Sequence, residues 1–171
     1  MARLSEWYGR LLNALVVVAC LLLLVMTVMI GADVLSRNIG GGGVAVSNEF
    51  SEDILYLMTL LAAPWLLRQG QHIRVDIILR ALPVRAAWVL EWVGDIVGFF
   101  CCLYFVWYGL LITAASYTAG SVNIKTLVTP EWWTLAPLPL GFALLGIEFI
   151  FRMHRLSTDA IGLRDDAISA A

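Results

Sequence analysis

Long apolar runs dominate the chain, and four of them are long enough to cross a membrane. The clearest covers residues 11–32, which contain no charged side chain. A hydrocarbon core of about 30 Å needs about 20 apolar residues in a helix. Further apolar segments cover about residues 50–67, 92–118 and 132–151. The pattern predicts an all-α membrane protein with four transmembrane helices.

The first apolar run has two interpretations. Arg3 and Arg10 precede it, as basic residues precede the apolar part of a cleaved signal peptide. The run is longer than the usual 7–15 apolar residues of such a peptide, however, and no clear pair of small residues marks a cleavage site after it. We therefore expect a retained transmembrane helix.

A charged segment, RQGQHIRVDIILRALP, separates the second and third runs at residues 68–83. Val75, Ile78, Leu79 and Leu82 recur at the spacing of one helical face. Ten helical residues reach only about 15 Å, too short to span a bilayer. The spacing predicts a short amphipathic helix at about 73–82 that lies along the membrane interface.

Basic residues are distributed unevenly between the two sides that four spans create. Nine of the 11 lie before the first span, between the second and third, or after the fourth. Arg37 and Lys125 alone fall on the opposite side. Because cytoplasmic loops are enriched in Lys and Arg, both termini are expected in the cytoplasm. Residues 1–155 would form the membrane domain, and residues 156–171 a polar cytoplasmic tail.

Composition argues against several other classes. The net charge is −2 and no basic block occurs, so nothing favours nucleic-acid binding. Cys20, Cys101 and Cys102 lie inside apolar runs without metal-ligand spacing. His72 has no nearby Ser or Cys nucleophile, so we predict no catalysis there, and we expect no cofactor. A structural role at the junction after the second span, beside Arg68 and Asp76, is the better interpretation.

Polar and small residues share one face at the start of the third span. They are Glu91, Gly94, Asp95, Gly98 and Cys102. A small residue four positions from another lets a second helix approach closely. We interpret this face as a candidate subunit interface. Two alternatives stay open: the acids lie at the membrane boundary without a partner subunit, or they bind a cation. For Glu148 we expect an ion pair near the helix end, close to Arg152.

Residues 47–85 carry an ordered set of motifs that resembles the signature of a known family. An acidic pair opens the second span, a basic-x-Gly-x-His motif and a Val-Asp step follow, and Leu-Pro closes the segment. The matching positions include Glu49, Glu52, Arg68, Gly70, His72 and Asp76. The family is that of the DctQ-type small membrane subunit of tripartite ATP-independent periplasmic (TRAP) transporters. Arg37 after the first span, and Pro-x-Trp and Pro-x-Gly motifs in residues 129–144, are similar too. Ala62-Ala63-Pro64 departs from the pattern.

This resemblance implies a bacterial inner-membrane complex of three components. The chain would pack against a large membrane subunit that carries the substrate and ion sites, and a periplasmic protein would deliver the substrate. An ion gradient, normally of sodium, would drive symport of an organic acid.

Two other functions are compatible with a four-helix membrane protein. A haem- or quinone-binding anchor would need paired histidines, and the chain has only His72 and His154. A stand-alone transporter would need a charged residue at the centre of a span, which the first two spans lack.

Overall fold

A computed structural model describes residues 2–43, 46–69, 84–124 and 128–158. Within them the fold is almost entirely helical, which confirms the predicted class. Four stretches are long and apolar enough to cross a membrane. The long helices are α1 (Ala2–Asn38), α2 (Ser47–Arg68), α4 (Val84–Ala119) and α6 (Pro137–Thr158). The predicted interfacial helix at 73–82 lies outside the described residues.

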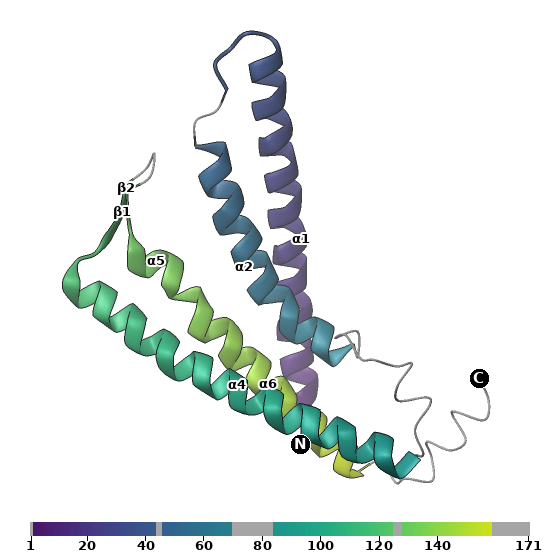
Figure 1. Ribbon diagram of the computed structural model, residues 1–171. Coiled ribbons are helices and arrows are strands. Elements are labelled where there is room, and N and C mark those ends of the chain that lie inside the picture. Colours follow the sequence, from purple (N-terminus) through teal and green to yellow (C-terminus); the bar gives the residue numbers. More distant parts are fainter. Residues whose placement is uncertain (1, 44–45, 70–83, 125–127, 159–171) are drawn as a thin grey trace.

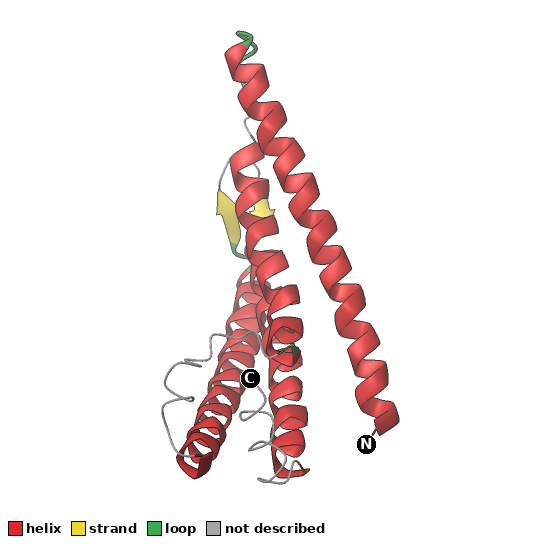
Figure 2. Ribbon diagram, turned by 90° about the vertical axis from the view of Figure 1, so that its right-hand side faces the viewer, coloured by secondary structure: helices red, strands yellow, loops and turns green. Residues whose placement is uncertain are grey.

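The helices form two antiparallel pairs that meet at one end. Helix α1 packs against α2, and α4 packs against α6. The pairs contact each other through α2 and α6. They lie close together where α1 begins and α6 ends, and they diverge toward the α1–α2 loop and the β-hairpin (Figure 1; Figure 2). The contacts that fix the pairs relative to each other are therefore concentrated at one end.

The long helices extend past the apolar segments from which they were predicted. Helix α1 begins nine residues before position 11 and ends six after position 32. At 1.5 Å per residue, its 37 residues span about 55 Å, more than the hydrocarbon core. Hydropathy identifies only the apolar part of a helix. The helical backbone hydrogen bonds continue beyond it, into the residues that lie at the polar membrane surface. Helix α6 likewise runs to Thr158, three residues into the predicted tail.

Helix α2 continues through Pro64, where the sequence departs from the family pattern. Pro64 is buried, and the helix ends four residues later at Arg68. Proline is tolerated inside transmembrane helices because neighbouring groups compensate for the lost hydrogen bond. The helix therefore reaches Arg68 without ending at the proline.

A hairpin and a short helix connect α4 to α6. Strands β1 (Val122–Ile124) and β2 (Val128–Pro130) pair antiparallel, with Asn123 opposite Thr129. Helix α5 (Glu131–Leu135) follows directly. A threonine followed by a proline, as at Thr129-Pro130, is typical of an N-cap and a first helical residue. The structure differs by one position, because Pro130 is extended, ends β2 and is itself the N-cap residue of α5.

The core is small and lies near the joint between the helix pairs. Its buried members are Leu67, Cys102 and Phe149, from α2, α4 and α6. Phe99, Phe142 and Leu145 pack against it. Most other large apolar side chains are exposed on the helix surfaces, as expected for a protein whose solvent is lipid.

Candidate functional site

A buried carboxylate and two arginines join α2 to α6 where the helix pairs meet. Glu148, on α6, is completely buried. Its Oε2 atom lies 3.6 Å from Nη1 of Arg68, the last residue of α2. Its Oε1 atom accepts a short hydrogen bond from Arg155, two turns further along α6. The carboxylate therefore has an intrahelical and an interhelical cationic partner.

The N-terminal part of α1 closes the other side of this arrangement. Nη2 of Arg68 donates hydrogen bonds to the Ser5 carbonyl oxygen at 2.9 Å and to the Ser5 hydroxyl at 3.3 Å. The Tyr8 hydroxyl donates to the Leu144 carbonyl oxygen at 2.6 Å. A Cβ atom on Gly9 would lie only 2.9 Å from Nη2 of Arg68. The absence of a side chain at Gly9 thus lets the guanidinium reach α1.

A second buried ion pair connects α4 to α6 nearby. Nη1 of Arg152 lies 3.2 Å from Oδ1 of Asp95, whose side chain is 2% exposed. Glu91, one turn before Asp95, is also buried. We call Ser5, Tyr8, Arg68, Asp95, Glu148, Arg152 and Arg155 the joint network. It connects all four long helices.

Electrostatics explains why these groups lie together. An ionised side chain removed from water is costly unless an opposite charge and hydrogen bonds compensate. In Glu148 and Asp95 the compensation comes from arginines of the same chain. Breaking such a pair leaves an uncompensated charge, which typically costs about 3–5 kcal/mol. The joint network therefore favours one arrangement of the helices.

The face predicted as a subunit interface is mostly occupied by α6 of the same chain. A Cβ atom on Gly98 would lie 2.5 Å from Cζ of Phe149, so α6 approaches closely there. Cys102 is in the core, and Asp95 pairs with Arg152. Gly94 differs, because it is exposed and a Cβ there would meet nothing within 4 Å. Of the two glycines, Gly98 therefore contacts α6 of the same chain, whereas Gly94 is open to the surface.

The remaining family-motif residues lie at the ends of the helices. Arg37 pairs with Asp33 across one turn of α1, at 3.0 Å between Nε and Oδ2. Glu49 and Glu52 lie in the first turns of α2, with Glu52 exposed. Arg68 belongs to the joint network. Gly70, His72 and Asp76 lie outside the described residues.

Several of these contacts had no separate signal in the sequence. The partner expected for Glu148 was Arg152, but Arg152 pairs with Asp95, while Arg155 and Arg68 pair with Glu148. Arg152 and Arg155 lie four and seven residues after Glu148 on α6, and both spacings suit an ion pair within a helix. Local spacing could therefore not distinguish the two arginines as partners of Glu148. The Asp33–Arg37 pair, by contrast, has the i, i+4 spacing of a helical ion pair and was open to prediction.

The described residues form ion pairs between helices and line one apolar hollow. They contain no group of three or more His, Cys, Asp or Glu side chains arranged to hold a metal ion. A hollow of about 370 Å³ lies between α2 and the α5–α6 segment. Its walls are leucine, alanine, proline, glycine and the indoles of Trp132 and Trp133. Such a lining suits an apolar group and offers little to a charged solute.

Comparison with known proteins agrees with the architecture. Residues 26–158 match the model of the DctQ component of tripartite ATP-independent periplasmic transporters. A curated relative is the ectoine TRAP transporter small permease protein TeaB of Halomonas elongata. The two sequences are 24% identical over 135 residues, which cover 79% of this chain and 69% of TeaB.

Proposed function

The chain belongs to the DctQ component family of TRAP transporters, and from this premise we propose that it braces the large membrane subunit of such a transporter. As a small permease subunit it is a multi-pass membrane protein. In the proposed role it fixes part of the complex in the bilayer without forming a solute pathway of its own. The large subunit and a periplasmic binding protein are its proposed partners.

The joint network is the observation that supports a bracing role. Arg68, Glu148 and Asp95 use their charges for contacts within the chain. A transport site needs polar groups that exchange partners with a solute or an ion, whereas these groups hold helices together. The hollow between α2 and α5–α6 is apolar. A rigid support fits these features better than a stand-alone transporter.

The position of the basic residues supports an orientation in the membrane. Arg10 lies in the first turns of α1, Arg68 ends α2, and Arg152 and Arg155 lie in the last turns of α6. These segments lie at the same end of the molecule (Figure 1). Arg37 lies at the opposite end of α1. The positive-inside rule supports placing the joint network, and both termini, at the cytoplasmic face of a bacterial inner membrane.

Coupling and substrate are proposed from the family. Uptake would be driven by an ion gradient, normally of sodium, and the solute would be an organic acid with a carboxylate. TeaB is named for an ectoine transporter, so ectoine belongs in the same test panel as dicarboxylates, keto acids and sialic acids.

Reconstitution in liposomes tests the proposal. Vesicles would contain this chain alone, the large subunit alone, or both, with binding protein and radiolabelled solute outside and an imposed sodium gradient. We expect uptake only with both membrane subunits, and a lower melting temperature of the large subunit without this chain. Uptake by this chain alone would overturn the proposal, as would full activity and stability of the large subunit without it.

A further inference from the structure

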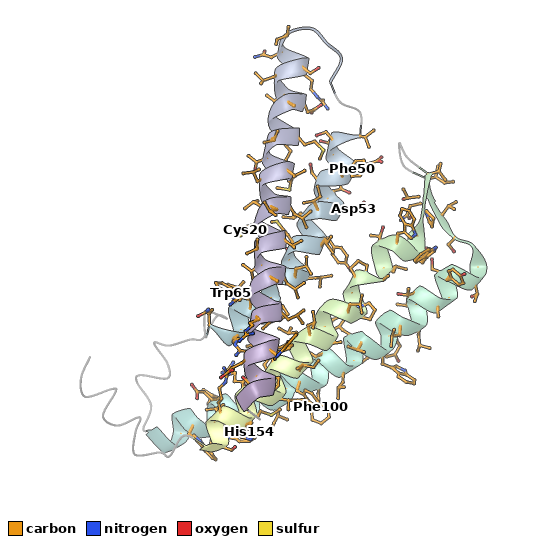
Figure 3. All side chains as sticks on the ribbon, turned by 180° about the vertical axis from the view of Figure 1, so that it is seen from behind. Cys20, Phe50, Asp53, Trp65, Phe100 and His154 are labelled. Carbon is orange, nitrogen blue, oxygen red and sulfur yellow. The ribbon has the colours of Figure 1, made fainter. Side chains whose placement is uncertain are left out.

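Helix α4 exposes a row of four aromatic side chains and one leucine on the surface opposite α6. Phe100, Tyr104, Trp107, Tyr108 and Leu111 follow the i, i+4, i+7, i+8, i+11 spacing of one face. Each is at least 47% exposed. The side that carries Gly98 and Cys102 packs against α6 instead. We call these five residues the aromatic face, and Phe100 is labelled where it projects outward in Figure 3.

The aromatic face lies at the middle of the membrane-crossing part of α4. Asp95 marks one boundary through its ion pair, and Ser116 marks the other through its hydrogen bond to Glu131. The 21 residue steps from Asp95 to Ser116 rise about 31 Å, close to the thickness of the hydrocarbon core. Tyr104 lies nine residues after Asp95, and Trp107 lies nine before Ser116. Both are therefore within about 3 Å of the midpoint along the helix.

This depth does not suit exposed Tyr and Trp side chains that face lipid. Their rings are amphipathic, and they concentrate at the two membrane–water interfaces. The ring centroids of Tyr104 and Tyr108 lie 4.4 Å apart, with the ring planes tilted by 38°. Among the described residues, however, neither hydroxyl nor the Trp107 indole N–H has a hydrogen-bond partner. Water is absent at that depth, lipid tails accept no hydrogen bonds, and neither interface is within reach of a tyrosine side chain.

The exposed surface of α1 has a different composition. Its large exposed side chains along the middle of the span are aliphatic, including Val17, Leu21, Leu24, Val25 and Val28. Aliphatic side chains leave no polar group unsatisfied in hydrocarbon. The exposed surface of α4 therefore carries donor groups in its Tyr and Trp side chains at a depth where the large exposed side chains of α1 carry none.

We propose that the aromatic face of α4 is the surface on which a transmembrane helix of the large subunit docks, offering hydrogen-bond acceptors to Tyr104, Trp107 and Tyr108. Backbone carbonyls or Ser, Thr and Asn side chains would supply these acceptors. Tyr and Trp are also the residues most enriched where proteins contact each other. The inference rests on the proposed function, because that function supplies the partner.

Site-specific photocrosslinking in the assembled complex tests the docking face. Benzoylphenylalanine would replace Tyr104 or Tyr108, and, as a matched control at similar depth on α1, Leu24. The full-length chain would be co-expressed with its large subunit and irradiated in membranes. We expect covalent adducts with the large subunit from α4 and lipid adducts from α1. Adducts of the α4 positions only with lipid or with a second copy of this chain would overturn the proposal, as would equal crosslinking from both helices.

Conservative substitutions give a second readout that does not depend on a bulky probe. Tyr104→Phe and Tyr108→Phe each remove one oxygen and keep the ring, so the isolated chain should fold normally. A hydrogen bond between membrane helices contributes enough to change the dissociation constant of the complex about threefold. The double variant should therefore weaken binding about tenfold. Unchanged binding of the double variant would contradict the proposal.

The two levels of inference fail in different ways. If the unmodified chain does not co-purify with the large subunit, the proposed function is wrong. If it co-purifies and the α4 positions neither crosslink to that subunit nor affect binding, the proposed function stands and the docking face is wrong.

Discussion

Replacing Glu148 by glutamine would test whether the joint network holds the helix pairs together. Glutamine has nearly the same size but no charge, so the packing of α6 should be preserved. Arg68 and Arg155 would then lie side by side without their shared carboxylate. The Arg155 side chain is 45% exposed and can be hydrated, whereas that of Arg68 is only 22% exposed. Most of the cost should therefore come from Arg68.

The magnitude follows from this burial. Removing one partner of a buried ion pair costs about 3–5 kcal/mol, and the exposed side chain of Arg155 favours the lower limit. We expect Glu148→Gln to lower the free energy of unfolding by about 3 kcal/mol, which is roughly a hundredfold change in the unfolding equilibrium. Asp33→Asn is the comparison variant: its carboxylate is also buried, at 8% exposed, but the Arg37 side chain left behind is 56% exposed and can be hydrated. That change should cost about 0.5 kcal/mol.

Reversible unfolding in mixed micelles, titrated with sodium dodecyl sulfate and followed by circular dichroism, would measure both values. A double-mutant cycle of Arg68→Gln with Glu148→Gln would isolate the interhelical contact, and we expect a coupling energy of at least about 1 kcal/mol. A loss for Glu148→Gln as small as that of Asp33→Asn, or additive effects in the cycle, would refute the assignment of the network as the contact that fixes the helix pairs.

Two further predictions use contacts between helices. Gly98→Leu should destabilise the isolated chain by about 1–3 kcal/mol, since its side chain would overlap Phe149, whereas Gly94→Leu should not destabilise it in the same unfolding assay. Equal losses of unfolding free energy in the two variants would contradict the internal packing of Gly98. If Gly94→Leu alone weakens binding of the large subunit, that result would support a partner contact at Gly94. The indole Nε1 of Trp65 donates a 2.9 Å hydrogen bond to Oδ1 of Asn13, between α2 and α1. Trp65→Phe and Asn13→Ala each remove this bond and should each lower the free energy of unfolding by about 1 kcal/mol. The double variant should lose no more stability than either single variant. Trp65 is labelled beside α1 in Figure 3.

Hydropathy identified the spans, but it missed the structure between the last two. Residues 122–124 lie beyond the third span predicted at about 92–118, and no helix or strand was predicted for them. They instead form β1, since Gly120, with φ of +63°, ends α4 and residues 128–130 offer a pairing strand. The break between α5 and α6 was easier to anticipate because Pro137 and Pro139 lie there, and proline favours the first turn of a helix.

The sequence by itself determined the number of spans, the uneven distribution of basic residues and the family. These properties depend on local composition and on motifs of adjacent residues. Only the tertiary structure decided that Arg68 meets Glu148, 80 positions away, and that Gly98 lies against Phe149 while Gly94 is open. The tertiary structure was also needed to find the aromatic face. The helical repeat shows which side chains share one side of α4, but only the structure shows which side is covered by α6 and which is exposed. Partners on different helices are selected by how the helices cross, and no spacing along one helix encodes that geometry.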